Sequence, residues 1–207
     1  MPTRGEIAAT FDAIAADFAA TREHPWRETV DFVSRLAAKS RILDLGCGNG
    51  RNAAILRDAG HTVVGLDASR GLLSFFAAKL GTDRLVHGDA VALPFHDGSF
   101  DAVHAVATIH HMPSEAERRR LLKECDRVLR PGGLLLVSAW AAEQPRFREE
   151  RSQDVHVPWK RSNGDEVVRF YHLFQEGELV RATTDAGFAI ERAWREGDNY
   201  VVLAAKP

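Results

Sequence analysis

The chain has 207 residues, of which 45% are hydrophobic, so it is long enough to bury the core of one domain spanning residues 1–207. Its 27 basic and 29 acidic residues give a formal net charge of −2, which excludes a uniformly basic nucleic-acid binder but allows a local basic patch. Residues 1–6 lack the apolar core of a signal peptide, and no segment approaches the roughly 18 apolar residues of a membrane span, so we expect a cytoplasmic protein that does not contact membrane.

The first 39 residues are predicted to form two helices. Apolar side chains recur at helical spacing on one face of the first helix: Ile7, Phe11, Ile14 and Phe18. The pattern resumes from Trp26 to Ala38, after a connector that contains Pro25. We expect residues 1–39 to be a helical lid over a ligand site.

Apolar strand-like segments alternate with helical ones from residue 41 onward. Strands are expected near 41–45, 62–66, 85–87, 101–106 and 134–140, with helices near 51–59, 69–80 and 115–129. A helix near 176–186 and two strands near 189–195 and 199–205 follow. This order predicts a doubly wound, Rossmann-like α/β fold. Its seven-stranded sheet is expected to be mostly parallel, with an antiparallel pair at one edge.

The first predicted strand ends in a glycine-rich turn, Asp44-Leu45-Gly46-Cys47-Gly48-Asn49-Gly50. Glycines there let the main chain approach a ligand closely, and the following helix offers free amides. The spacing G-x-G-x-G behind an acid differs from the G-x-G-x-x-G of a dinucleotide site, and Asp44 suits a cationic amino group better than a phosphate. The turn therefore predicts a nucleoside cofactor with a cationic end.

Acidic residues also end the next two predicted strands. Asp67 lies about 20 residues after the first glycine, where a ribose-binding carboxylate is expected. In this order the segments between residues 40 and 140 resemble the class I methyltransferases that use S-adenosylmethionine. The candidate cofactor-binding residues are Asp44, Gly46, Gly48, Asn49, Gly50, Asp67, Asp89, Ala90 and Val106. Cys47 and Cys125 form neither a disulfide framework nor a metal-ligand set, so we expect packing roles for both and no bound metal.

The chemistry of the acceptor is constrained by residues after the fourth strand. The Asp/Asn-Pro-Pro-aromatic tetrapeptide of amine-methylating nucleic-acid enzymes is absent there, and so is the nearby thiolate that a C5-methylating enzyme needs. A carboxylate acceptor would be ionised at neutral pH, because its reference pKa is about 4, and would need no general base. Cationic or donor groups such as Arg22, His110 or Arg169 would then position it.

Several stretches outside the cofactor core carry a more specific pattern. They are residues 18–22 with Trp26, 109–111, 140–144, 153–159, and 169–174 with Glu178 and Leu179. Together they resemble the tRNA carboxymethyluridine methyltransferase family, which includes the methyltransferase domain of the AlkB-homologue wobble-uridine enzyme. The resemblance implies esterification of the 5-carboxymethyl group of wobble uridine in the tRNA anticodon stem-loop, with S-adenosylmethionine as donor. It also implies a heterodimer with a small zinc-binding activator protein.

The resemblance and the position of the loops define the candidate acceptor residues. Catalytic roles are expected for Arg22, His111, Arg169 and Tyr171. Substrate binding is expected for Thr21, Arg22, Trp26, His110, His111, Trp159, Arg169, Tyr171 and His172. We expect Trp159 to stack on a splayed anticodon base. Residues 141–175 are predicted to be an acceptor-side insertion. Its first part, 141–168, shows no periodicity and is predicted to be an irregular loop.

Two further features bear on the partners. Phe75 and Phe76 cannot both face the core, because consecutive helix residues lie about 100° apart, so one of them is expected beside an exposed edge strand, Leu85–His87. That edge is where the activator is expected to add. Only Lys160–Val168 separate Trp159 from Arg169, where many relatives carry a longer insertion, which could remove part of the RNA-binding surface.

The alternative function is a small-molecule O- or C-methyltransferase. A non-catalytic cofactor-binding module is a third hypothesis.

Overall fold

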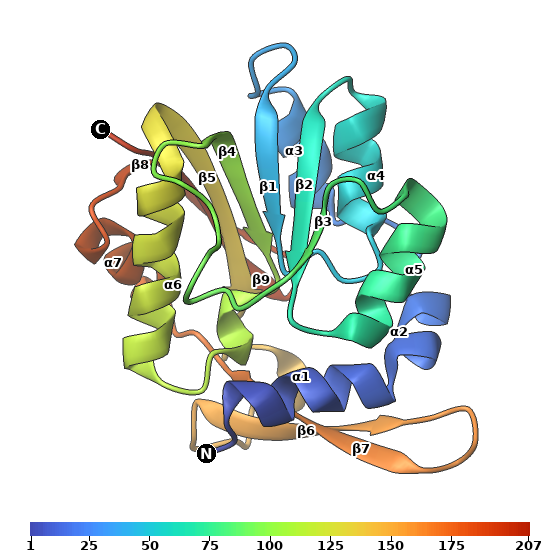
Figure 1. The fold of residues 1–207 in the computed structure, drawn as a ribbon. Coiled ribbons are helices and arrows are strands. Elements are labelled where there is room, and N and C mark those ends of the chain that lie inside the picture. The colour runs from blue at the N-terminus through green and yellow to red at the C-terminus, as the bar shows by residue number, and fades with distance from the viewer.

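The computed structural model describes residues 1–207, and its centre is a seven-stranded sheet of order β3-β2-β1-β4-β5-β9-β8 (Figure 1). The first five strands in sequence are parallel: β1 (Arg41–Leu45), β2 (Thr62–Asp67), β3 (Leu85–His87), β4 (Phe100–Val106) and β5 (Leu129–Trp140). Antiparallel pairing joins β9 (Asn199–Ala205) to β5 and β8 (Ala189–Glu196) to β9. The predicted sheet, with its antiparallel edge pair, is confirmed.

Helices cover both faces of this sheet. They are α3 (Arg27–Val33), α4 (Arg51–Asp58), α5 (Arg70–Leu80), α6 (Glu115–Val128) and α7 (Glu178–Asp185). Since side chains alternate along a strand, β1 sends Ile42 to the cluster that contains residues of α3, α4 and α5, and Leu43 to the cluster that contains residues of α6 and α7. No helix in the structure has the length and apolar character needed to cross a membrane.

The N-terminal segment differs from its prediction. The expected first helix is broken at Ile14, a fully buried residue with ψ of 6°, into α1 (Arg4–Ala13) and α2 (Ala15–Thr21). Near the break the Asp12 carboxylate accepts hydrogen bonds from Ser69 Oγ at 2.7 Å and from the Gly71 amide at 2.8 Å. The end of α1 is thereby held on the start of α5, and the chain turns there. The second expected helix is shorter than predicted, because α3 ends at Val33.

The predicted irregular loop over 141–168 is wrong in its second half. There β6 (Asp154–Lys160) pairs antiparallel with β7 (Glu166–His172), and two short 3-10 helices, η1 (Ile109–His111) and η2 (Pro145–Phe147), lie earlier in the chain. Val155, Val157 and Trp159 alternate with more polar residues, a period of two that the high charge content obscured. Figure 1 shows this hairpin beneath α1, beyond the carboxyl ends of the strands.

Candidate active site

A cavity of about 540 Å³ lies at the carboxyl ends of β1, β2 and β4. The glycine-rich turn forms one wall, and α1 contributes Arg4, Ile7 and Phe11 to another. Seven of the predicted cofactor-binding residues line it: Gly46, Gly48, Asn49, Asp67, Asp89, Ala90 and Val106. Asp44 and Gly50 do not, although both belong to the same turn.

The three glycines of the turn are needed for different reasons. All three have positive φ, but a Cβ on Gly46 would lie 2.2 Å from Thr108 Oγ1, and one on Gly50 would lie 2.8 Å from the Phe76 ring. A Cβ on Gly48 would meet no atom within 4 Å. Gly46 and Gly50 therefore let the turn pack against the protein, whereas Gly48 faces the open cavity and leaves room for a ligand.

The Asp67 carboxylate is fixed by the backbone at the end of β2. Its Oδ2 accepts from the Gly48 amide at 2.8 Å, and its Oδ1 accepts from the Ser69 amide at 2.8 Å. Burial raises the pKa of this carboxyl group, and the two backbone hydrogen bonds act in the opposite direction. Each oxygen keeps a second lone pair, so the group can still accept hydroxyl donors such as those of a ribose.

Asp44 lies beneath the turn in a buried polar network. Its Oδ1 is 2.8 Å from His104 Nδ1, and His104 Nε2 is 2.9 Å from Thr29 Oγ1. The second oxygen, Oδ2, is buried and has no protein partner. The structure therefore places Asp44 behind the cavity wall, where it supports the turn, instead of on the surface that a ligand touches. Sequence reasoning did not identify His104, which sits in an otherwise apolar strand.

These features fit S-adenosylmethionine. The open space over Gly48 admits a ligand against the main chain, Asp67 offers acceptors for hydroxyl groups, and the orphaned Asp44 oxygen adds negative potential behind the turn. Ile7, Leu72 and Met112 add apolar surface to the cavity wall that suits an adenine ring.

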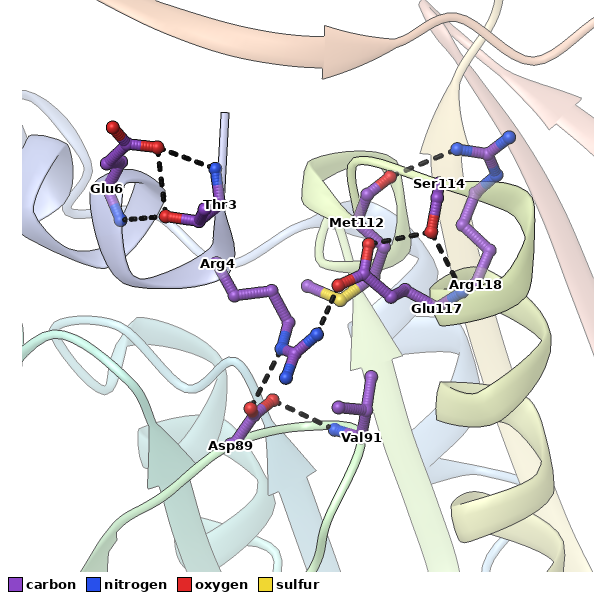
Figure 2. A network of polar contacts seen from close by, with 9 residues as sticks. All are labelled: Thr3, Arg4, Glu6, Asp89, Val91, Met112, Ser114, Glu117 and Arg118. Carbon is purple, nitrogen blue, oxygen red and sulfur yellow. Dashed lines mark hydrogen bonds and ion pairs between the residues drawn. The ribbon is translucent and has the colours of Figure 1, made fainter. Parts of the chain in front are cut away.

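Arg4 ties the start of α1 to the far side of the cavity (Figure 2). Its Nε donates to Asp89 Oδ2 at 2.8 Å and its Nη1 pairs with Glu117 at the start of α6. The other Asp89 oxygen accepts from the Val91 amide at 3.1 Å. Arg4 was not predicted as a site residue, and no sequence motif marks it.

On the acceptor side, side chains form a continuous run that we name the aromatic–arginine ladder. Its members, in order of contact, are Arg146, Trp140, Tyr171, Arg169, Trp159, Arg22 and Phe18. Trp140 and Tyr171 are stacked with ring centroids 3.9 Å apart. The guanidinium carbons lie between 4.0 and 5.7 Å from the neighbouring ring centroids, within the range of cation–π contacts.

The ladder carries positive charge that the protein does not neutralise. None of Arg22, Arg146 and Arg169 has a carboxylate within 4 Å. Arg169 is 6% exposed and its Nε is buried without a partner. Burial lowers the pKa of Arg169 and raises the pKa of Tyr171 to about 12, so this phenol is neutral at neutral pH while the guanidinium groups stay charged.

His110 and His111 lie between the ladder and the cavity. His111 Nδ1 is 3.1 Å from the Phe170 carbonyl oxygen, so this nitrogen carries the proton and Nε2 is an acceptor. His110 Nδ1 accepts from the Trp140 amide at 3.0 Å, so its proton is on Nε2. Burial lowers the pKa of His111 to about 4 and that of His110 well below its usual range. Both rings are therefore neutral at neutral pH.

Only part of the predicted acceptor set reaches the cavity. Trp26 and His111 line it, and Phe18 belongs to both the cavity wall and the ladder. Arg22, Trp159, Arg169 and Tyr171 are brought together in the ladder, and His110 is fully buried beside Tyr171 with ring centroids 5.1 Å apart. Trp159 contacts two guanidinium groups, those of Arg22 and Arg169.

Two predicted substrate residues lie elsewhere. Thr21 is exposed, and its hydroxyl donates to the Asp17 carbonyl oxygen at 3.0 Å. His172 is 5% exposed, with its ring nitrogens 2.7 Å from Asp154 and 2.8 Å from Glu178. The prediction of a substrate contact for His172 is corrected: both nitrogens are used to join the hairpin to α7, and neither is free for a ligand.

Comparison with known proteins agrees with the cofactor cavity. Residues 43–137 match the family model described as a methyltransferase domain. The chain is 35% identical over 187 residues to a putative methyltransferase of Encephalitozoon cuniculi, covering 87% of this chain and 85% of that protein. It is 32% identical over 219 residues to the tRNA (carboxymethyluridine(34)-5-O)-methyltransferase of Schizosaccharomyces pombe, covering 95% and 94%.

A longer relative is similar over one part of its length. The chain is 28% identical to the Xenopus tropicalis tRNA (carboxymethyluridine(34)-5-O)-methyltransferase over 99% of this chain but spans only 43% of that protein. Among solved structures, an S-adenosylmethionine-dependent methyltransferase of Methanosarcina mazei has a TM-score of 0.74 at 24% identity, covering 88% of this chain and 98% of that one. A putative methyltransferase of Haloferax volcanii, solved with the Trm112 methyltransferase activator, has a TM-score of 0.74 at 20% identity and 97% coverage of both chains.

Proposed function

This chain belongs to the tRNA carboxymethyluridine methyltransferase family, and from that premise we propose that it esterifies the 5-carboxymethyl group of wobble uridine in a tRNA anticodon. It is an S-adenosylmethionine-dependent methyltransferase with the class I fold. The proposal concerns the identity of the substrate and of the ester product. We also propose that the reaction takes place in the cytoplasm. The relatives whose names state this reaction support the proposal.

The observation that carries the proposal is the uncompensated charge of the aromatic–arginine ladder. A carboxylate acceptor is already ionised at neutral pH, so it needs cations that hold it and no strong base that activates it. The ladder supplies three guanidinium groups without carboxylate partners, and it meets the cofactor cavity at Phe18 and, through Tyr171, at His111. Neither histidine is charged at neutral pH, so the arginines supply the positive charge.

The cofactor, when bound, supplies a methyl group on a sulfonium. Arg169 is the best candidate to hold the acceptor carboxylate, because its guanidinium is buried, flanked by Trp159 and Tyr171, and leaves Nε free. Phe11, Phe18 and Trp26 add aromatic surface to the cavity, and we expect them to exclude water from the acceptor oxygen. Catalysis then consists of holding one anionic oxygen in line with the methyl group.

The variant Arg169→Gln tests this function against methylation of a small acid. With tRNA that carries 5-carboxymethyluridine, we expect kcat/KM to fall at least 100-fold while affinity for S-adenosylhomocysteine stays within about twofold. The matched control is Arg192→Gln, since Arg192 also lies over an aromatic ring, Trp194 at 4.5 Å, but on β8. Full turnover of tRNA by Arg169→Gln, or faster turnover of small acids than of tRNA by the wild type, contradicts the proposal.

We also propose that the enzyme acts with a small zinc-binding activator protein that adds to the edge of the sheet at β3. Support comes from the Haloferax volcanii protein, which was solved with an activator, and from the surface here. The outermost strand, β3, has only three residues, and Phe75 beside it is 37% exposed whereas Phe76 is 2% exposed. As predicted, only one of the two phenylalanines faces the core.

Co-expression with such an activator tests the partner proposal. We expect the activator to raise the soluble yield and the affinity for S-adenosylhomocysteine, and the variant Phe75→Glu to lose both gains without losing thermal stability. A cavity of about 460 Å³ along β3, lined by residues that include Leu85 and Val86, gives the partner a place to contact. Equal yield and affinity with and without the activator contradict this part of the proposal.

A further inference from the structure

The three guanidinium groups of the aromatic–arginine ladder exceed what one acceptor carboxylate neutralises. Some arginines elsewhere in the chain pair with carboxylates, as Arg4 does with Asp89 at 2.8 Å and Arg127 with Glu124 at 2.8 Å, whereas the three of the ladder do not. On the ladder, burial lowers the pKa of Arg169, Tyr171 acts in the opposite direction, and the charges of Arg22 and Arg146 act in the same direction as burial. Unpaired like charges held this close indicate that the site is built for a ligand with more than one negative group.

Two of the cations in the ladder differ in burial. Arg169 is 6% exposed and lies over Tyr171 and Trp159, whereas Arg146 is exposed and lies over Trp140 with its guanidinium carbon 4.0 Å from the ring centroid. Tyr171 covers one face of the Trp140 ring, so the Arg146 guanidinium lies on the other. The two guanidinium groups therefore contact different rings of the stacked pair, Arg146 that of Trp140 and Arg169 that of Tyr171.

The side chain of Arg146 is also oriented by a hydrogen bond to a buried residue, Gln144. Its Nε donates to Gln144 Oε1 at 2.8 Å, and Gln144, which is 1% exposed, donates from its Nε2 to the Asp198 carbonyl oxygen at 3.0 Å. The second bond fixes which way the Gln144 amide points. A buried amide that orients an exposed arginine leaves both terminal NH₂ groups of that arginine free and pre-positioned, which is the arrangement that bidentate anion recognition uses.

We propose that the ladder binds two anionic groups of one substrate, the carboxylate at Arg169 and a backbone phosphate adjacent to the acceptor nucleoside at Arg146. This inference rests on the proposed function. Any polynucleotide that presents the carboxylate within its chain carries a phosphodiester on each side of the same nucleoside. A substrate that brings the carboxylate to Arg169 therefore also brings a phosphate. Arg146 is then a positioning residue that makes the enzyme prefer RNA over the free nucleoside, as phosphate contacts fix register without reading sequence.

The kinetic test compares two acceptors, free 5-carboxymethyluridine and an anticodon stem-loop that contains it. For Arg146→Gln we expect KM for the stem-loop to rise about tenfold with kcat within twofold of wild type, so that the stem-loop to nucleoside ratio of kcat/KM falls about tenfold. The slope of log(kcat/KM) against log salt should become shallower by about 0.7, the value for one contact to single-stranded nucleic acid. The control Arg192→Gln should change neither the ratio nor the slope.

A binding measurement separates this inference from the proposed function. The affinity of wild type and Arg146→Gln for the stem-loop without the carboxymethyl group is measured by fluorescence anisotropy across salt concentrations. If wild type methylates no tRNA yet binds the stem-loop through Arg146, the proposed function fails and the phosphate site stands. If Arg146→Gln keeps both the affinity and the salt slope of wild type, or if Arg192→Gln loses as much, the phosphate site is overturned.

Discussion

His111 donates its Nδ1 proton to the carbonyl oxygen of Phe170 across 3.1 Å, so its only free nitrogen is the Nε2 acceptor. The ring also packs against Phe11, Tyr171 and His110, with centroids 4.8, 4.6 and 4.4 Å away. This surrounding holds the pKa of His111 at about 4. His111 therefore offers a hydrogen-bond acceptor to the cavity at neutral pH, and we assign the positive charge of the ladder to its arginines.

The buried His110 and the partly buried His111 should make the fold sensitive to mild acid. The pKa of His111 is about 4 in the folded protein and about 6.5 in an unfolded chain, so the unfolded state binds more protons between these values. Stability is complete above about pH 6.5 and falls as the pH drops to about 4, by up to about 3 kcal/mol from His111, with His110 acting in the same direction. In His111→Gln the slope of unfolding free energy against pH, measured by urea titration, should be shallower. Parallel slopes for the two proteins would contradict this.

Glycine substitutions should distinguish two effects of an added Cβ: loss of space for the ligand, and backbone strain. Gly48→Ala and Gly60→Ala both place a Cβ at positive φ in open space, so each should lose about 1–2 kcal/mol. Of these two glycines only Gly48 lines the cavity, and of the two variants we expect only Gly48→Ala to bind S-adenosylhomocysteine at least tenfold more weakly by calorimetry. Gly46→Ala should lose more stability than either, because its Cβ would overlap Thr108. Equal cofactor affinity for the Gly48 and Gly60 variants would contradict the assigned cradle.

Breaking the Arg4 contact should change ligand kinetics more than stability. Both of its ion pairs are partly exposed, so Arg4→Gln should cost less than about 1 kcal/mol. Since Arg4 holds α1 against Asp89, we expect S-adenosylhomocysteine to dissociate several-fold faster in stopped-flow displacement. Arg35→Gln, which breaks an exposed pair with Glu191 away from the cavity, is the control. Unchanged dissociation from Arg4→Gln would show that α1 does not retain the ligand.

Removing His104 should destabilise the fold through Asp44. The variant His104→Leu leaves the buried Asp44 carboxyl group without its hydrogen-bond partner, at a cost of about 3 kcal/mol. The double variant Asp44→Asn/His104→Leu should recover part of this loss in urea unfolding, because an amide is less costly to bury than a carboxylate. Strictly additive losses in the two single variants would show that the two side chains are not coupled.

Sequence patterns predicted the sheet and the cofactor turn, because both depend on local signals: apolar periodicity, strand-end acids and glycine spacing. The hairpin was missed, since Val155, Val157 and Trp159 lie in a segment rich in charge and their partners on β7 are 8 to 16 residues away. His172 was assigned to the substrate, but its neighbours Asp154 and Glu178 come from other elements and occupy both nitrogens. The contacts of Arg4 with Asp89 and of His104 with Asp44 join residues 85 and 60 positions apart, which no local pattern reveals.

The chemical identity of the methylated product tests the central claim most directly. The protein, with and without the proposed activator, is incubated with methyl-labelled S-adenosylmethionine and total tRNA, and the RNA is digested to nucleosides that are resolved with and without mild alkali. We predict label on a single uridine derivative, released by alkali because it is a carboxylic ester. A labelled nucleoside that is stable to alkali, or label found only in small molecules, would contradict the account.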